Sequence, residues 1–336
     1  MSALQSILLS LPPERSHDLA IAGLKGAALL PGRVSPLPGR STTILGKPLR
    51  NPVGLAAGLD KNAEAVLGLA RCGFGFVEVG TVTPLAQPGN PQPRLFRLPE
   101  HKALINRMGF NNDGMQAMAR RLARVRSSNK LCGTLLGVNL GKNKDTSNED
   151  AASDYLKGMD CLHGYADYFT INLSSPNTPG LRSLQHGDAL RSLLSRLKER
   201  QLQLAGQSQP VPLMLKVAPD LSSDDVAQIA EQVVACAFDG VIATNTTVSR
   251  EAVAEHPHAI ETGGLSGQPL ADRSVEVVRQ LRSVLPEGMA LVGVGGISTE
   301  SQARDMLQAG AQALQIYTSF IYNGPKMVHK LVAATN

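Results

Sequence analysis

The feature that most constrains the fold is a series of short apolar segments that alternate with amphipathic ones. The apolar segments lie at residues 51–58, 74–82, 131–141, 166–175, 211–220, 238–247, 289–298 and 313–321. Most of them are apolar on both faces, as the strands of a buried parallel sheet are. Between them, segments such as 187–204, 222–236 and 299–309 have helical spacing. Eight such units in series predict a (β/α)8 barrel rather than an open, doubly wound sheet.

The composition is that of a folded protein that needs no cross-links. The 336 residues are 43% hydrophobic and 18% charged, which excludes a disordered chain and is ordinary for one large barrel. The four cysteines lie far apart with no CxxC pair, and the seven histidines form no HExxH motif. We therefore expect no disulfide framework and no metal site. Aromatic residues make up only 4%, so a nucleic-acid partner is not expected.

Residues 1–40 differ in pattern from the rest of the chain. Leu4, Ile7, Leu8 and Leu11 have the spacing of a short amphipathic helix, which Pro12-Pro13 ends. A second helix is expected from about Glu14, with an apolar stripe at His17, Ile21, Leu24 and Ala28, and Pro31-Gly32 ends it. A loop rich in Pro, Gly and Ser follows. We therefore expect a helical extension with its linker over 1–40 and the barrel over 41–336.

The positive charge is concentrated in this extension. The formal net charge is +5, and residues 1–50 hold six cations and two acids. A basic, amphipathic segment is attracted to anionic lipid, although a solvated face without a partner is the simpler alternative. No run of eighteen apolar residues occurs, so no transmembrane helix is expected. The N-terminus also lacks the pattern of a secretory signal.

The residues at the ends of the predicted strands indicate a site at the mouth of the barrel. In strand order these ends carry Ala57-Gly58 with Lys61, Thr81, Asn139, Asn172 with Ser175, Lys216, Thr244-Asn245-Thr246, Gly295-Gly296, and Tyr317-Thr318. One polar strand end is usually a cap or a turn, but eight together are not explained by capping. Barrel enzymes place their chemistry at this end. The long connections 83–112 and 248–271 are expected to contribute to the site.

The strand ends favour particular ligands. The glycines of GVGGIS, followed by a helix near Thr299, predict an anion site that Tyr317-Thr318 completes, unless they form only a tight turn. Asparagine side chains both donate and accept hydrogen bonds, which suits a planar heterocycle with ring amides. The asparagines in question are Asn106, Asn139, Asn172, Asn177 and Asn245.

Two further residues are candidates for a role in the reaction, but each also has a structural explanation. Lys216 lies in an apolar strand and needs an anion nearby. That anion is either an acid such as Asp220, in a structural salt bridge, or a cofactor that gains negative charge on reduction. Ser175 is the candidate nucleophile or base in the loop NLSSPNTPG, although Asn177 and Thr178 can also form a simple turn there.

Ten strings in order resemble one family. They are GLAAGLDKN, EVGTVTP, PRLFRLPE, INRMGFNN, GVNLGKNK, INLSSPNTPGLR, VIATNTT, TGGLSG, GVGGI and QIYTSF. Together they resemble dihydroorotate dehydrogenase, and the membrane-associated, quinone-dependent class most closely. The resemblance covers nearly the whole chain, including the N-terminal PPERSHDLA segment. It implies an FMN-containing (β/α)8 barrel that oxidises dihydroorotate to orotate in pyrimidine synthesis.

The resemblance also implies residue roles. FMN contacts are implied for Ala57, Gly58, Leu59, Asp60, Lys61, Thr81, Asn139, Asn172, Lys216 and Thr244, and contacts to its phosphate for Gly267, Gly296, Tyr317 and Thr318. Substrate contacts are implied for Lys61, Asn106, Arg107, Met108, Gly109, Phe110, Asn172, Asn177, Asn245 and Thr246. Ser175 stands at the position of the base, where the soluble class has cysteine. The resemblance places His17, Arg97 and Tyr317 beside a quinone tunnel.

The mechanism that the resemblance implies has two halves. Ser175 removes a proton from carbon 5 of dihydroorotate while carbon 6 passes a hydride to the flavin, and Lys216 stabilises the reduced flavin. The N-terminal helices then admit ubiquinone or another membrane quinone. This implies a peripheral protein on the cytoplasmic face of the inner (cell) membrane.

Three alternatives remain. A soluble fumarate- or NAD-linked enzyme would carry a cysteine base, and a 2-hydroxy-acid oxidase would carry a His/Arg pair at the substrate. If the N-terminal part were a docking module with the barrel as a scaffold, the protein would be colourless.

Overall fold

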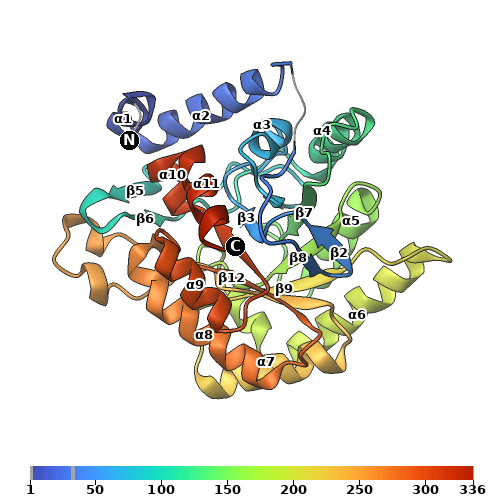
Figure 1. Cartoon of the computed structure of the whole chain (residues 1–336). Coiled ribbons are helices and arrows are strands. Elements are labelled where there is room, and N and C mark those ends of the chain that lie inside the picture. The colour runs from blue at the N-terminus through green and yellow to red at the C-terminus, as the bar shows by residue number, and fades with distance from the viewer. Residues whose placement is uncertain (1–2, 32–34, 336) are drawn as a thin grey trace.

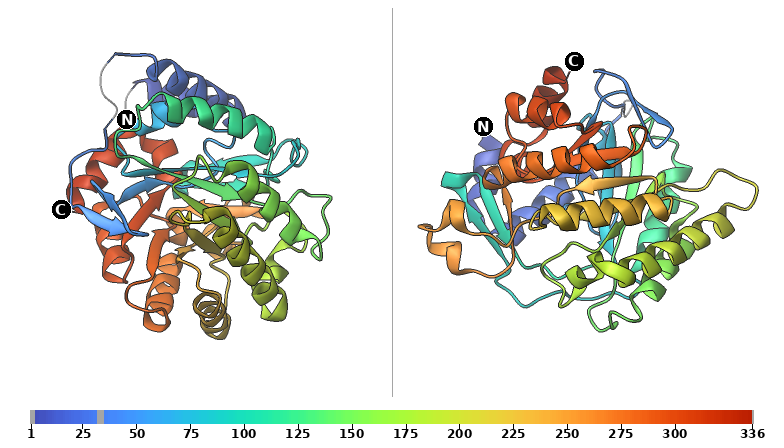
Figure 2. Two further views of the ribbon diagram at one scale, coloured as in Figure 1. Left: turned by 90° about the vertical axis from the view of Figure 1, so that its right-hand side faces the viewer. Right: turned by 90° about the horizontal axis from the view of Figure 1, so that it is seen from below.

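The core of the protein is a closed barrel of eight parallel strands (Figures 1 and 2). The computed structural model describes residues 3–31 and 35–335. In chain order the barrel strands are β3 (Val53–Leu55), β4 (Phe76–Val82), β7 (Leu135–Leu140), β8 (Tyr168–Asn172), β9 (Leu213–Val217), β10 (Gly240–Ala243), β12 (Ala290–Val294) and β13 (Ala313–Ile316). Each lies within one of the eight predicted apolar segments, and β13 pairs with β3 to close the ring. The predicted (β/α)8 fold is confirmed.

Helices cover the outside of the barrel (Figure 2). They are α3 (Val66–Ala70), α4 (Met115–Ser127), α5 (Ala151–Leu162), α6 (Gly187–Ala205), α7 (Ser223–Ala235), α8 (Ala271–Val284), α9 (Glu300–Gln308), α10 (Thr318–Asn323) and α11 (Pro325–Ala334). Capping boxes at Ser222 and Thr299 start α7 and α9, because each hydroxyl accepts from a backbone N–H three residues on. The three helical segments predicted from spacing therefore match α6, α7 and α9 within one residue at each end.

A hairpin that the sequence analysis did not identify packs against the amino-terminal end of the barrel. It consists of β1 (Thr42–Ile44) and β2 (Lys47–Leu49), which pair antiparallel. Ile44 and Leu49 are buried in a cluster with Phe76 and Tyr168, the first residues of β4 and β8. The hairpin thus covers apolar side chains at the end of the barrel opposite the predicted site.

The two long connections meet in a second, antiparallel sheet. The connection after β4 contains β5 (Leu95–Leu98), η1 (Pro99–His101) and β6 (Ala103–Asn106). The connection after β10 contains η3 (Glu251–Val253), η4 (Pro257–Ile260), β11 (Gly264–Gly267) and, directly after β11, η5 (Gln268–Leu270). The sheet order is β11-β6-β5. This pairing brings residues about 160 positions apart next to each other, as the register Asn106↔Gly264 shows.

The predicted N-terminal helices are α1 (Ala3–Ser10) and α2 (Pro13–Ala27). Figure 1 shows both helices lying across one side of the barrel. Gly68 of α3 allows close packing, since a Cβ there would lie 2.1 Å from the carbonyl oxygen of Leu24. The side chain of Leu4 and residue Gly32, both part of the predicted pattern, lie outside the described residues. Among the residues described, no helix is both long and apolar enough to cross a bilayer.

Candidate active site

A large cavity opens at the carboxyl ends of the barrel strands, beneath the antiparallel sheet. It encloses about 1200 Å³, including its open mouth. Twenty residues singled out from the sequence line it: Ala57, Gly58, Lys61, Thr81, Asn106, Met108, Gly109, Phe110, Asn172, Ser175, Asn177, Lys216, Thr244, Asn245, Thr246, Gly267, Gly295, Gly296, Tyr317 and Thr318. Barrel closure therefore brings together residues from seven of the eight strand ends, all but that of β7.

Two predicted site residues lie just behind this lining. Asn139 accepts hydrogen bonds from Thr81 Oγ1 at 2.5 Å and from Asn172 Nδ2 at 3.1 Å, so it supports two lining residues. The Asp60 carboxylate accepts from the backbone N–H groups of Glu64 and Ala65, both at 2.8 Å. Asp60 thereby holds the turn that carries Lys61.

Arg107 and Leu59 lie elsewhere. Arg107 is ion-paired with Glu261 at 2.6 Å, and its guanidinium lies 4.7 Å from the ring centre of Phe96. Arg107 therefore braces the antiparallel sheet and does not line the main cavity. Leu59 lines a second cavity, beside α2.

The amide side chains are held in defined orientations. Asn172 Nδ2 also donates to Thr81 Oγ1 at 3.1 Å, and Asn177 Nδ2 donates to Asn106 Oδ1 at 3.2 Å. Asn245 Nδ2 donates to Ser174 Oγ at 3.0 Å. Because these groups fix one another, the cavity presents a preorganised set of donors and acceptors to a polar ring.

Glu78 is a buried residue that the sequence analysis missed. Its carboxylate accepts from Asn139 Nδ2 at 2.8 Å, Gln315 Nε2 at 2.8 Å, Tyr168 Oη at 3.0 Å and Thr170 Oγ1 at 3.1 Å. A signal was present, because Glu78 is the one charged residue in the apolar run FGFVEVGTV. It organises the barrel interior directly below the amides of the site.

Lys216 is buried and lines the main cavity. Burial lowers the pKa of its ammonium, and the charge of Glu78 acts in the opposite direction. Among the described residues, the ammonium has no hydrogen-bond or salt-bridge partner. The alternative of a structural salt bridge to Asp220 is wrong, since Asp220 pairs with Arg182 at 2.8 Å. Lys216 is thus a cation that faces the cavity.

One end of the cavity suits a phosphate. Gly267 and Gly296 have left-handed φ angles of +102° and +73°. A Cβ on Gly296 would lie 2.3 Å from Ala271 Cα, so only glycine fits there. Ser319 Oγ is buried without a hydrogen-bond partner, and so is Gln315 Oε1 in the same cavity. Buried polar atoms are normally paired, so both indicate a polar ligand. The Ser319 hydroxyl can donate to a phosphate oxygen, whereas the Gln315 carbonyl oxygen only accepts and requires a donor group of the ligand.

The sequence left open whether the Ser175 loop contributes to the site or forms a simple turn, and the structure shows both features. Ser175 is buried and lines the main cavity. Its Oγ accepts from the backbone N–H of Asn177 at 3.2 Å, which is a serine turn. The turn therefore holds the hydroxyl in place at the cavity wall.

Lys61 connects the main cavity with a second one, between α2 and the barrel. The second cavity encloses about 1120 Å³ and is lined by His17, Lys61, Arg94 and Tyr317, among others. Burial and the charge of Arg94 lower the pKa of Lys61 to about 8. Burial and the charge of Lys61 lower the pKa of His17 to about 3, so His17 is neutral at physiological pH. Tyr317 borders both cavities.

Arg97 does not line either cavity. Its Nη1 donates to the carbonyl oxygens of Leu9 at 2.9 Å and Leu11 at 2.6 Å, at the end of α1. The cavity instead receives Arg94, which is ion-paired with Glu14 of α2 at 3.0 Å. The two arginines therefore fasten the N-terminal helices to β5.

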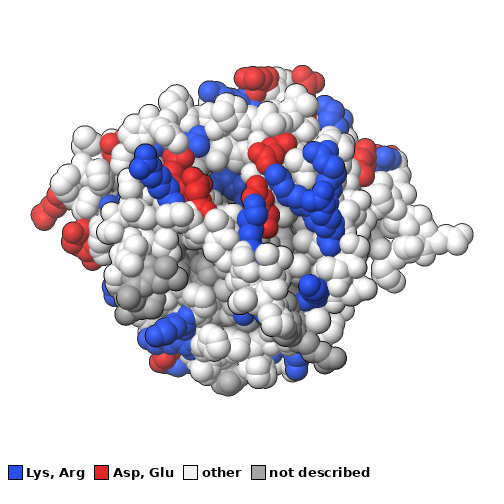
Figure 3. Space-filling model, turned by 90° about the horizontal axis from the view of Figure 1, so that it is seen from above, with Lys and Arg blue, Asp and Glu red and all other residues white. Residues whose placement is uncertain are grey.

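The surface around α1 and α2 is mixed in charge. Figure 3 shows basic and acidic side chains interspersed on this face. Lys25 of α2, for example, pairs with Glu64 at 2.8 Å. Several large apolar side chains on the N-terminal segment are exposed, namely Ile7, Leu19, Leu29 and Leu30. Apolar exposure is therefore a clearer feature of this face than a continuous basic surface.

Comparison with known proteins points to one family. The family model for dihydroorotate dehydrogenase matches residues 40–335. The chain is 48% identical to a dihydroorotate dehydrogenase (quinone) of Marinobacter nauticus, over 98% of this chain and 97% of the relative. It is 50% identical to the Bordetella pertussis protein of the same name, over 97% and 94%. The crystal structure of DHODH from Eimeria tenella in complex with ferulenol has a TM-score of 0.90 at 40% identity, covering 96% of this chain and 90% of that one.

Proposed function

The chain belongs to the dihydroorotate dehydrogenase family, and we propose which of its residues carry out each part of that family's reaction. The reaction is the oxidation of dihydroorotate to orotate in pyrimidine synthesis, with a quinone as acceptor. Members of the family use a flavin. The observation that carries the assignment is the convergence of Ser175, Lys216 and four asparagines on one cavity.

The flavin that fits the main cavity is FMN. The glycine-lined end, with Ser319 Oγ and Thr318, suits its phosphate. Thr81, Asn172 and Lys216 are positioned to contact its ring system from the strand ends. When bound, FMN accepts the hydride that leaves carbon 6 of the substrate. Lys216 then offsets the negative charge of the reduced ring, a role that a buried cation with no partner in the protein can fill.

Dihydroorotate is assigned to the space between the amides and the antiparallel sheet. Lys61 binds its carboxylate, since it is a largely buried cation that lines the cavity. The ring is held by Asn106, Asn172, Asn177, Asn245 and Thr246, whose orientations the amide contacts restrict. Met108, Gly109 and Phe110 form one wall.

Ser175 is assigned as the base. Its Oγ takes the proton from carbon 5 of dihydroorotate, and the N–H of Asn177 donates to that oxygen. A serine must pass its own proton on as it acts, because a neutral hydroxyl is a weak base. The presence of serine rather than cysteine at this position favours the quinone-dependent class over the soluble one.

Residues 1–40 are assigned to quinone access, as a unit distinct from the barrel at 41–336. The cavity beside α2 reaches Tyr317, which also borders the main cavity. A quinone in this cavity would therefore lie next to the flavin site, and His17 would be a neutral wall residue. The exposed Ile7, Leu19, Leu29 and Leu30 fit a helix pair in a bilayer interface. We place the protein peripherally, on the cytoplasmic face of the inner membrane, with ubiquinone as a suitable acceptor.

The test is anaerobic. The purified protein should be yellow with bound FMN, and dihydroorotate should bleach the flavin before any quinone is added. Addition of a long-tailed quinone should then restore the colour. A colourless protein would support the scaffold alternative, and bleaching by a 2-hydroxy acid but not by dihydroorotate would support a hydroxy-acid oxidase.

A further inference from the structure

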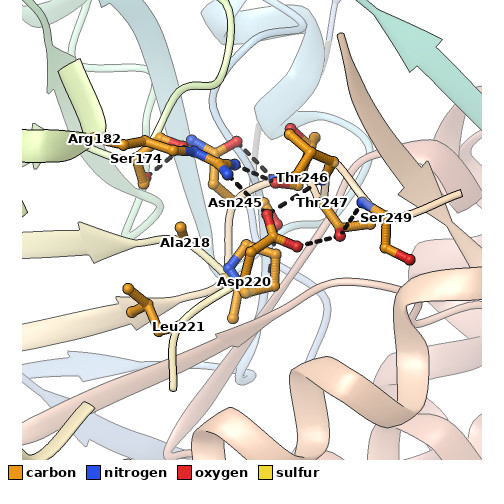
Figure 4. Close-up of polar contacts among 12 residues, drawn as sticks. Ser174, Arg182, Ala218, Asp220, Leu221, Asn245, Thr246, Thr247 and Ser249 are labelled. Carbon is orange, nitrogen blue, oxygen red and sulfur yellow. Dashed lines mark hydrogen bonds and ion pairs between the residues drawn. The ribbon is translucent and has the colours of Figure 1, made fainter. Parts of the chain in front are cut away.

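Arg182 makes three contacts that join separate loops around the candidate site (Figure 4). It lies in η2 (Leu181–Gln185), which follows the Ser175 loop. Its Nε donates to the carbonyl oxygen of Ser174 at 3.0 Å, and its Nη2 donates to the carbonyl oxygen of Thr246 at 2.9 Å. Its Nη1 is paired with Asp220 Oδ2 at 2.8 Å. The guanidinium thus uses all three of its nitrogens.

Asp220 extends this connection to a further part of the chain. Its carboxylate accepts from Thr247 Oγ1 and from the backbone N–H of Val248, the latter at 3.2 Å. Ser174, Asp220 and Thr247 belong to the loops after β8, β9 and β10, which are neighbours in the barrel. The Arg182–Asp220 pair therefore ties three successive strand-end loops together.

The contacts reach the residues that face the ligand. Ser174 directly precedes Ser175, and Thr246 itself lines the main cavity. Asn245, which also lines it, donates to Ser174 Oγ at 3.0 Å. Arg182 does not line the cavity, so any effect on chemistry must pass through these neighbours.

We propose that Arg182, paired with Asp220, is a positioning residue that sets the Ser175 loop relative to the ring-binding residues Asn245 and Thr246. The planar guanidinium is suited to this because its donors point in fixed, divergent directions, which a lysine does not reproduce. Without it, Ser174 and Thr246 lose their shared donor. The loops keep the contacts of Asn245 with Ser174 and of Asp220 with Thr247 and Val248, but they can shift relative to one another. A displacement of about 1 Å in a reacting group can cost about 100-fold in rate. This proposal rests on the assignment of Ser175 as the base.

The test compares Arg182→Gln with a matched control, Arg126→Gln. Arg126 also bonds a backbone carbonyl, that of Tyr165 at 2.8 and 2.6 Å, and pairs with Asp167 at 2.9 Å. Asp167 immediately precedes β8, at the end of the barrel away from the cavity. Both variants lose one partly buried ion pair, so stability should fall similarly in the two.

The expected result separates the two variants. In anaerobic stopped-flow measurements with FMN-loaded protein, Arg182→Gln should slow flavin reduction by dihydroorotate by about 10- to 100-fold. It should also weaken orotate binding and speed amide hydrogen exchange in residues 173–187. Arg126→Gln should change none of the three. Arg182→Lys keeps the charge but not the planar arrangement of donors. The logarithm of its flavin-reduction rate should therefore lie nearer to that of Arg182→Gln than to that of wild type.

The opposite results would overturn the proposal. One is a flavin-reduction rate for Arg182→Gln within twofold of wild type. The other is an equal loss of that rate in Arg182→Gln and Arg126→Gln. If Arg182→Gln does not fold, Arg182→Lys and Asp220→Asn decide, and reduction within twofold of wild type in both would refute it. Wild type and Ser175→Ala are measured in parallel: if Ser175→Ala is reduced as fast as wild type, the assignment of the base fails, which is a separate outcome.

Discussion

The buried carboxylate of Glu78 opposes the loss of charge at Lys216. Burial alone lowers the pKa of the Lys216 ammonium, and Glu78 shifts this pKa back upward. Four donors hold the carboxylate in the barrel interior, below the cavity that Lys216 faces. Glu78 thus favours the charged form of Lys216 at the proposed flavin site without pairing with it directly.

Lys216→Ala should weaken flavin retention and slow flavin reduction, because the reduced ring loses its counter-charge. The unfolding free energy of the flavin-free protein should not fall, because the change removes a buried ammonium that bonds no protein group. The flavin-to-protein ratio and anaerobic stopped-flow rates measure the first two effects. Normal flavin content with a normal reduction rate would contradict the role of Lys216.

Glu78→Gln should destabilise the protein by about 1–3 kcal/mol, because the amide NH₂ would face groups that donate to the carboxylate now. Urea unfolding measures this loss. Glu231→Gln on α7 is the control, since Glu231 is exposed, and its effect should be within about 0.5 kcal/mol. Equal stability of the two variants would show that the Glu78 contacts contribute little.

Orotate binding should weaken as the pH rises through about 8, the value to which burial lowers the pKa of Lys61. Below that pH the ammonium is charged and binds the ligand carboxylate; above it the charge is lost, and affinity should fall up to tenfold per pH unit. Spectral titration of the bound flavin with orotate measures this dependence. Lys61→Met should bind weakly at every pH, and a wild-type-like pH profile in that variant would assign the dependence to another group.

Ser175→Ala should slow flavin reduction by about 10²- to 10⁴-fold, the usual cost of losing a general base. Flavin content and orotate affinity should stay near wild type, because among the described residues the hydroxyl accepts a single backbone hydrogen bond. Anaerobic stopped-flow and orotate titration measure the two. Reduction within a few-fold of wild type would rule out Ser175 as the base.

Deletion of residues 1–38 should separate the two half-reactions. Flavin reduction by dihydroorotate should stay near normal, whereas reoxidation by a long-tailed quinone should fall sharply, because the cavity beside α2 loses one wall. Binding to anionic vesicles should weaken and lose its salt sensitivity. A substitution at His17, which is neutral, should have a smaller effect or none. Equal losses in both half-reactions would mean that α1 and α2 only cap the barrel.

The order and type of the main elements could be predicted from local sequence patterns. Apolar runs and helical spacing are local properties, so the eight barrel strands and the N-terminal helix pair were predictable within a few residues. The alignment of strand ends follows from the parallel arrangement, which is why most of the predicted residues line one cavity, and the connections 83–112 and 248–271 add the rest. The motif strings added the family and the chemistry expected at each position.

Which side chains become partners depends on the folded barrel and could not be predicted from the sequence. Glu78 and Gln315 are 237 positions apart and Arg97 and Leu9 are 88 apart, and no local pattern encodes either contact. Asp220 is close to Lys216 in sequence and was one of two alternatives for its partner, but the strand directs Lys216 into the barrel while Asp220 meets Arg182 outside the cavity. Local spacing sets which face a residue occupies, whereas its partner depends on how the barrel closes, because closure brings distant strand ends within hydrogen-bond distance.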